Sequence, residues 1–153
     1  MKHLLMTLVA LLFTAGAVAQ NADALYKEGK ALYDLENYQK AFPKLKAAAY
    51  KGHKKAQYRV GLCYDKGRGV TEDDAAAVSW YLKSAKQDYA KAQYELAKCY
   101  LKGEGVAADE AKAKQWLTKA VKNAKHGQEI RDKMDEEIAE GKQTAKCLKS
   151  MLK

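Results

Sequence analysis

A ten-residue segment occurs twice in this chain, and the two copies start thirty-six residues apart. Residues 61–70 read Gly-Leu-Cys-Tyr-Asp-Lys-Gly-Arg-Gly-Val, and residues 97–106 read Ala-Lys-Cys-Tyr-Leu-Lys-Gly-Glu-Gly-Val. Further along, Trp80 is followed by Trp116 at the same interval. A fixed period between about 20 and 50 residues is typical of a solenoid, in which each unit buries its apolar face against its neighbours. The repeat therefore predicts a solenoid.

The segment after each copy has the apolar spacing of an α-helix. Its small and aromatic residues recur at i, i+3, i+4, i+7 and i+8, which places them on one helix face. In the second unit this face is Ala77, Trp80, Tyr81, Ser84 and Ala85, in the third it is Ala113, Trp116, Leu117, Ala120 and Val121, and in the first it is approximated by Ala41, Leu45, Ala48 and Ala49. Alanines allow neighbouring helices to approach closely, and the tryptophans fill the space beside them.

The Gly-x-Gly in each copy predicts a turn between two helices. Gly67 and Gly103 suit the left-handed conformation that ends a helix, and Asp73 and Asp109 suit the N-cap of the helix that follows. A phosphate-binding loop is not supported, because no strand precedes the glycines and no Gly-Lys-Ser/Thr follows them. The repeat positions to which we assign structural roles are Gly67, Gly69, Trp80, Gly103, Gly105 and Trp116.

Residues 56–85 contain Ala-Gln-Tyr-Arg-Val-Gly-Leu-Cys-Tyr, then Lys-Gly-Arg-Gly-Val-Thr-Glu-Asp, then Ala-Val-Ser-Trp-Tyr-Leu-Lys-Ser-Ala. This pattern resembles the Sel1-like repeat (SLR) subclass of the tetratricopeptide superfamily. The third unit matches with Ala97 and Leu117 in place of a glycine and a tyrosine, and the first is degenerate, with a turn four residues shorter. The resemblance implies an all-α fold, a right-handed α/α superhelix of about three helix pairs with units at about 22–53, 54–89 and 90–127.

The C-terminal residues 128–153 fall outside the repeat and show two apolar stripes among charged residues. The first stripe is Ile130, Met134 and Ile138, and the second is Cys147, Leu148, Met151 and Leu152. Because the last apolar face of a solenoid must be covered, we interpret 128–153 as C-terminal capping helices. The alternative is a basic amphipathic helix that lies on a membrane or on a partner, and the sequence leaves it open.

The first nineteen residues have the pattern of a secretory signal peptide. Lys2 and His3 precede an apolar run from Leu4 to Phe13, and Ala17-Val-Ala19 gives an A-x-A cleavage site. A membrane anchor would need about 20 apolar residues, and this run is shorter. We expect cleavage near Ala19, export to the periplasm or the medium, and one solenoid domain at 20–153.

The charge balance is basic but poor in arginine. The chain has 28 basic and 19 acidic residues, a formal charge of +9, and cleavage removes Lys2 to leave +8. Its arginines are Arg59, Arg68 and Arg131. Recognition of bases and phosphates relies on the guanidinium group, whereas scattered lysine is typical of a solvated helical surface. We therefore expect no nucleic-acid partner, while weak attraction to acidic surfaces remains open.

Three cysteines would enter an oxidising compartment. Cys63 and Cys99 occupy equivalent positions in successive units, where packed helices are about 8 to 10 Å apart. A disulfide requires α-carbons within about 7 Å, so we expect both residues to be buried and not to pair with each other. Cys147 could reach Cys99 if the C-terminal segment folds back, and the sequence does not decide this.

No catalytic or metal-binding constellation emerges from the sequence. Ser150-Met-Leu-Lys153 matches the S-x-x-K of serine enzymes that react with β-lactams, but no second motif of that class accompanies it. His53 and His126 lie in turns of different units, and no H-E-x-x-H or C-x-x-C occurs. We expect no enzymatic activity, cofactor or metal, and keep a cell-envelope enzyme, such as a β-lactam or cell-wall hydrolase, as the alternative.

A tyrosine occupies the same position in the first helix of every unit: Tyr26, Tyr58 and Tyr94. In the tetratricopeptide pattern this column faces the concave groove in which peptides bind, and the next two columns would be Lys30, Leu62 and Lys98, then Tyr33, Asp65 and Leu101. Tyrosine suits recognition because it offers apolar area with a polar tip. A tyrosine is common at this position in Sel1-like units, however, which favours the alternative that these side chains simply pack. We predict an adaptor that holds an extended peptide or a partner's helix, with an acidic or carboxylate-terminated segment favoured by the lysines.

Overall fold

The computed structural model describes residues 21–123 and 125–153, so the expected signal peptide lies outside the described residues. The described chain is all-α and contains no strand, which confirms the predicted fold class. Residues 21–34 are helical, and the helices that follow are α2 (Tyr38–Tyr50), α3 (Lys54–Asp65), α4 (Asp74–Ala85), α5 (Ala90–Lys102), α6 (Glu110–Lys122), α7 (Gly127–Ala139) and α8 (Gln143–Ser150).

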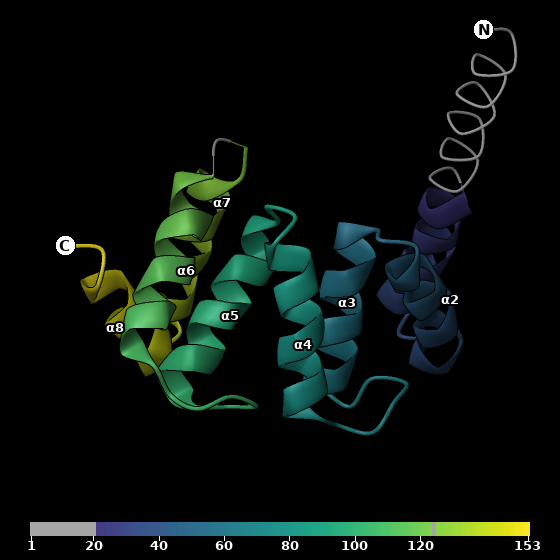
Figure 1. The fold of residues 1–153 in the computed structure, drawn as a ribbon, viewed down its shortest axis with the longest axis horizontal. Helices are drawn as coiled ribbons and strands as arrows, with labels where there is room; N and C mark the ends of the chain where they lie inside the picture. The colour runs from purple at the N-terminus through teal and green to yellow at the C-terminus, as the bar shows by residue number, and fades with distance from the viewer. Residues whose placement is uncertain (1–20, 124) are drawn as a thin grey trace, which may run out of the picture.

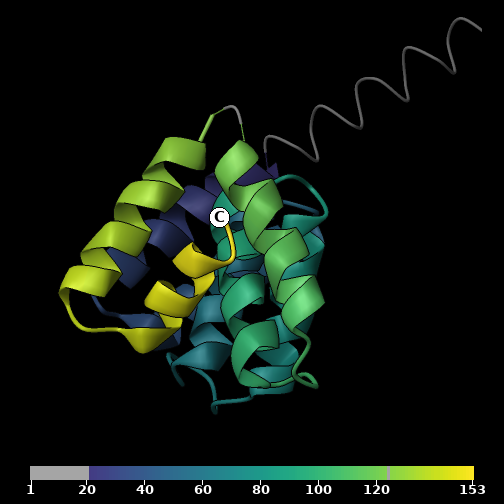
Figure 2. The same cartoon turned by 90° about the vertical axis from the view of Figure 1, so that its left-hand side faces the viewer.

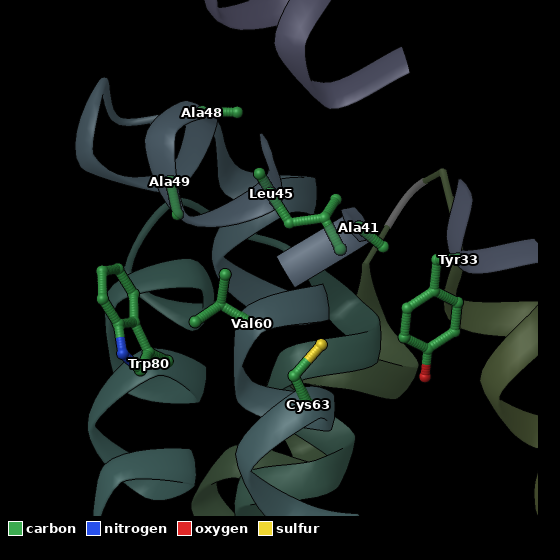
Figure 3. Packing of buried hydrophobic residues seen from close by; sticks show 9 residues of the cluster. Tyr33, Ala41, Leu45, Ala48, Ala49, Val60, Cys63 and Trp80 are labelled. Atoms are coloured by element: carbon green, nitrogen blue, oxygen red, sulfur yellow. The ribbon is translucent and has the colours of Figure 1, made fainter. Parts of the chain in front are cut away.

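The helices lie side by side in chain order, with residues 21–34 and α8 at opposite ends of the array (Figure 1). Buried side chains form three successive clusters instead of one central core. Leu45 and Val60 belong to the first cluster (Figure 3), Tyr81 and Leu96 to the second, and Leu117 and Ile130 to the third. Each helix pair therefore buries its apolar face against its neighbours, as expected of a solenoid.

The long turns follow the predicted chemistry. Gly67 and Gly103 have φ of +60° and +75°, in the left-handed region. The side chain of Asp73 accepts a hydrogen bond from the Ala76 N–H at 2.8 Å, and Asp109 does the same for Lys112 at 2.9 Å. Both glycines and both N-caps are thus confirmed.

The second glycine of each Gly-x-Gly has a role that the sequence did not reveal. Gly69 and Gly105 also have positive φ, +73° and +66°. A Cβ at Gly69 would collide with the Tyr38 carbonyl, and one at Gly105 with the Asp74 carbonyl. These carbonyls belong to the start of the second helix of the preceding unit, so each glycine allows the turn to rest directly on that helix.

The two departures of the third unit from the second are linked in the structure. A Cβ at Gly61 would lie 2.5 Å from the Tyr81 ring, so the ring of α4 occupies the space that a side chain on α3 would need. In the third unit, Ala97 and the smaller Leu117 share one buried cluster. A larger residue on the first helix is therefore accompanied by a smaller one on the second.

The C-terminal residues form a fourth helix pair, α7 and α8. Both helices contact α5 and α6, and Figure 2 shows α8 lying between α6 and α7. Ile130, Met134 and Leu148 are buried, whereas Leu152 is exposed. Gly141, with φ +82°, makes the turn between the two helices. Helical packing thus continues from the last repeat unit through the segment predicted to form the C-terminal capping helices, residues 128–153.

Candidate functional site

The first helix contributes Tyr26, Lys30 and Tyr33 to the predicted groove. The ring of Tyr26 is half-buried and stacks on His53, with 4.3 Å between ring centroids. Lys30 is exposed and pairs with Asp34. Tyr33 is buried, and its hydroxyl accepts a hydrogen bond from Arg68 at 2.5 Å. Tyr26 and Lys30 therefore reach solvent, whereas Tyr33 packs.

The second unit presents Tyr58 at the surface. Its half-buried ring lies 6.0 Å from the ring of Tyr81 and 5.3 Å from that of Tyr89, measured between centroids. Burial raises the pKa of Tyr58 well above its ordinary value, so the hydroxyl stays protonated. Leu62 and Asp65, on the same helix, are partly exposed. Two aromatic neighbours thus hold Tyr58 in place.

The third unit differs from the prediction. Tyr94 is fully buried, and its hydroxyl donates to Glu137 Oε2 at 2.8 Å, so it cannot line an open groove. Lys98 is held between Glu95 at 2.6 Å and Glu137 at 3.7 Å, and Leu101 packs on the apolar cluster below. The reason is α7, which lies against α5 and covers the place where the sequence analysis expected solvent.

Ion pairs fix α7 on α5 along its length. Lys91 pairs with Glu129 at 2.6 Å, and Lys133 reaches Glu95 at 2.8 Å. Glu95 is only 6% exposed. Burial alone would raise the pKa of Glu95, but the nearby Lys133 and Lys98 outweigh it and lower that pKa. The carboxylate is therefore charged and paired at neutral pH.

A hollow of about 620 Å³ lies between α3 and α7, across the start of α5. We call it the α3–α7 hollow, and its lining is Tyr58, Lys91, Gln128, Glu129, Ile130, Asp132, Lys133 and Glu136. Tyr58 is the residue of the predicted groove that lines it. Since Lys91 and Lys133 are paired with glutamates, Asp132 and Glu136 give the rim an acidic side. The hollow can accept an apolar side chain beside Tyr58 with a basic group near that rim.

A second hollow, of about 770 Å³, was missed by the sequence analysis. We call it the lysine cleft, and its lining is Lys54, Lys55, Asp88, Tyr89, Thr118, Lys119, Lys122, Asn123, Lys125 and His126. Its lining residues lie at or beside the turns that join one unit to the next. Those turns are at the edge of the solenoid opposite the Gly-x-Gly turns (Figure 1). The sequence does show lysines next to His53 and His126. Their meeting in one cleft could not be read from the sequence, because only the fold brings the turn at His53 close to the turn at His126.

Ser150 and the three cysteines lie on helices of the described chain. Ser150 Oγ donates to the Cys147 carbonyl at 2.6 Å, a bond within the end of α8. All three cysteines are free thiols, and burial raises the pKa of Cys63 to about 11 and that of Cys99 to about 12. In residues 21–123 and 125–153, no group of three or more His, Cys, Asp or Glu side chains could hold a metal ion.

No helix of the described chain is both long enough and apolar enough to span a membrane. α8, the candidate for a membrane-lying helix, instead buries Ala145 and Leu148 against the solenoid.

Two segments of the chain match a known repeat family. Residues 54–89 and 90–124 match the Sel1 repeat. A crystal structure of a Sel1 repeat protein from Oxalobacter formigenes has 36% identity and a TM-score of 0.60, over 63% of this chain and 40% of that one. A protective antigen of uropathogenic Escherichia coli strains with an SLR fold has 32% identity and a TM-score of 0.65, over 83% of this chain and 28% of that one.

Among curated proteins, chitin synthase regulatory factor 3 of Schizosaccharomyces pombe is 48% identical over 42 residues. The match covers 28% of this chain and 4% of the yeast protein. The similarity to these relatives is thus a similarity of repeat units, and each relative is considerably longer than the part that matches. Proteins built from Sel1 repeats are generally scaffolds for protein interaction.

Proposed function

Because two Sel1 repeats make this chain a Sel1-like repeat protein of the α/α-solenoid class, we propose that it is an exported, non-enzymatic scaffold for a partner protein. The partner would place an extended peptide or a helix in the α3–α7 hollow, against Tyr58. The observation that carries this proposal is the hollow itself, about 620 Å³ in volume, with a half-buried tyrosine in its wall.

The position of Tyr58 supports a role in recognition. Its ring is held between Tyr81 and Tyr89, so little side-chain freedom is lost when a ligand packs on it. Tyrosines with a fixed ring and a protonated hydroxyl offer apolar contact and a hydrogen bond together. Residues of this kind contribute a large share of the energy at protein interfaces.

The charges of the hollow refine the expected ligand. Lys91 and Lys133 are already paired with carboxylates of the chain, and Lys30 pairs with Asp34. The unsatisfied charge at the rim is that of Asp132 and Glu136, although Asp132 accepts a hydrogen bond from Gln128 at 2.8 Å. A segment with an apolar residue followed by a basic one fits this chemistry better than an acidic segment.

Export is proposed from residues 1–19, which have the charged start, apolar run and A-x-A site of a signal peptide. Expression in a bacterial host followed by osmotic shock and amino-terminal sequencing tests it. We expect a periplasmic product beginning at Gln20. A cytoplasmic product that keeps Met1 would contradict export without affecting the scaffold proposal.

The binding proposal is tested with peptides selected from a phage-displayed library on the full chain. We expect Tyr58→Phe and the double variant Asp132→Asn/Glu136→Gln each to weaken a selected peptide about fivefold, the size of one interfacial hydrogen bond or ion pair. The matched control is Glu72→Gln/Glu110→Gln, which removes the same charge from exposed positions elsewhere. Fluorescence anisotropy measures affinity, and equal weakening by the control would reject the hollow as the site.

A further inference from the structure

The lysine cleft gathers five ammonium groups from three separate places in the chain. Lys54 and Lys55 come from the start of α3, Lys119 and Lys122 from the end of α6, and Lys125 from the turn before α7. The repeat brings these places together because every unit begins at the same edge of the solenoid. No single stretch of sequence contains the cluster.

The positive charge of the cleft is not balanced by the described chain. Asp88 is the acidic residue of its lining, and Asp88 Oδ1 already accepts a hydrogen bond from Gln93 at 3.1 Å. The neighbouring Glu129 carboxylate already contacts the side chains of Lys91 and His126. Among residues 21–123 and 125–153, no carboxylate lies within salt-bridge distance of any of the five lysines. A bound polyanion would relieve the repulsion between them.

The backbone around the cleft is held in place by hydrogen bonds. Lys54 Nζ donates to the Gln87 carbonyl and Asn123 Nδ2 to the Asp88 carbonyl, each at 3.2 Å. Asn123 Oδ1 in turn accepts from the backbone N–H groups of Lys125 and His126, at 3.1 and 3.0 Å. These bonds hold Lys54, Asn123 and the backbone N–H groups of Lys125 and His126 in place before any ligand arrives, which lowers the entropic cost of binding.

We propose that the lysine cleft binds a run of aspartate or glutamate side chains in an acidic segment of a partner protein. Separate ammonium groups on three chain segments suit a row of carboxylates, and the lining contains no arginine, the residue that grips phosphate in a bidentate manner. The hollowed shape fits a peptide better than a flat membrane surface. This site is distinct from the α3–α7 hollow and rests on the proposed function only in that the acidic segment belongs to a protein.

The test uses a hexaglutamate peptide and the full chain in a calorimetric titration at low ionic strength. Lys122→Gln/Lys125→Gln removes two lysines of the cleft whose side chains make no hydrogen bond, ion pair or cation–π contact with the described residues. Lys40→Gln/Lys146→Gln is the matched control, with the same formal charge and two exposed lysines outside the cleft. We expect the cleft variant to bind about tenfold more weakly, the product of two exposed ion pairs, and the control to stay within about twofold of the wild type.

Three outcomes would overturn the proposal. The first is wild-type protein that does not bind hexaglutamate, and the second is equal weakening in both double variants, which would show a response to net charge alone. The third is loss of binding to phosphatidylglycerol vesicles in the cleft variant while its hexaglutamate affinity is unchanged, which would assign the cleft to a membrane. Peptides selected on the α3–α7 hollow are measured in parallel. Their unchanged binding to the cleft variant separates failure of this inference from failure of the scaffold proposal.

Discussion

At the scale of single residues, the size of a side chain on the first helix of a unit is matched to the size of its neighbour on the second helix. Gly61 leaves room for the Tyr81 ring, whose hydroxyl is buried with no hydrogen-bond partner among the described residues. In the next unit, alanine at position 97 accompanies leucine at position 117. We therefore expect the two positions to be energetically coupled, with either combination filling the same space.

Gly61→Ala should destabilise the protein, because its Cβ would lie 2.5 Å from the Tyr81 ring. We expect a loss of about 1 to 3 kcal/mol, the usual cost of overpacking a core. In Gly61→Ala/Tyr81→Leu, which copies the third unit, at least about 1 kcal/mol of that loss should be recovered. Urea unfolding of the four proteins in the cycle measures the coupling. Strictly additive effects would contradict it.

The cysteines should differ in reactivity. Cys63 and Cys99 are buried, and burial raises their thiol pKa to about 11 and about 12, so the reactive thiolate is scarce at pH 8. Cys147 is half-buried near the end of α8. We expect a thiol reagent such as Ellman's reagent to label Cys147 in the folded protein and the other two only after unfolding. A Cys147→Ser variant that is labelled as fast as the wild type would be inconsistent with this order.

At the scale of elements, α7 is held by a mixture of apolar and ionic contacts. Ile130 and Met134 are buried in the third cluster, while Glu95, Lys98, Lys133 and Glu137 form an ionic network above them. A buried ion pair adds little net stability compared with apolar residues, but loss of one partner leaves an unpaired charge. The position of α7 is therefore sensitive to protonation or substitution of a charged residue in this network, although such changes leave the apolar contacts intact.

The attachment of α7 should weaken in acid. Because the pKa of Glu95 is lowered from its ordinary 4.5 in the folded protein, its contribution is complete above that value and is lost as pH falls through the folded pKa. We expect the protection factors of the α7 backbone amides, which take account of the slower intrinsic exchange in acid, to decrease as the pH falls below 4.5.

Glu95→Gln is the matching variant for this acid effect. It should already show fast exchange in α7 at pH 7, after a loss of about 3 kcal/mol, because Lys133 is left unpaired and Lys98 is left with Glu137 alone. Glu36→Gln, at an exposed position, is the control. Exchange measured by mass spectrometry decides the matter: a Glu95→Gln protein with wild-type protection in α7 would show that the apolar contacts alone hold the helix.

At the scale of the whole molecule, the repeat in the sequence was sufficient for the architecture. The period predicted the solenoid, and the glycines and aspartates predicted the turns, because those features depend on contacts that recur every thirty-six residues. Tyr94 could not be placed correctly, since its burial depends on α7, which lies beyond the recognisable repeat. The lysine cleft was likewise hidden, because its residues are distant in sequence and meet only when the units stack.

A chain stacked in this way should respond locally to damage. Leu45 is fully buried among neighbours from the first helix, α2 and α3 (Figure 3), so Leu45→Ala should cost about 2 to 5 kcal/mol of local packing energy. Since the described helix pairs pack mainly against adjacent pairs, stability is approximately a sum over units and their interfaces. We expect faster hydrogen exchange in residues 21–34, α2 and α3, and nearly unchanged exchange in α7 and α8. Leu148→Ala, buried at the other end, should give the reverse pattern. If either substitution accelerated exchange equally along the whole chain, the molecule would behave as one cooperative core, and the interfaces between its units would be stronger than their separate clusters imply.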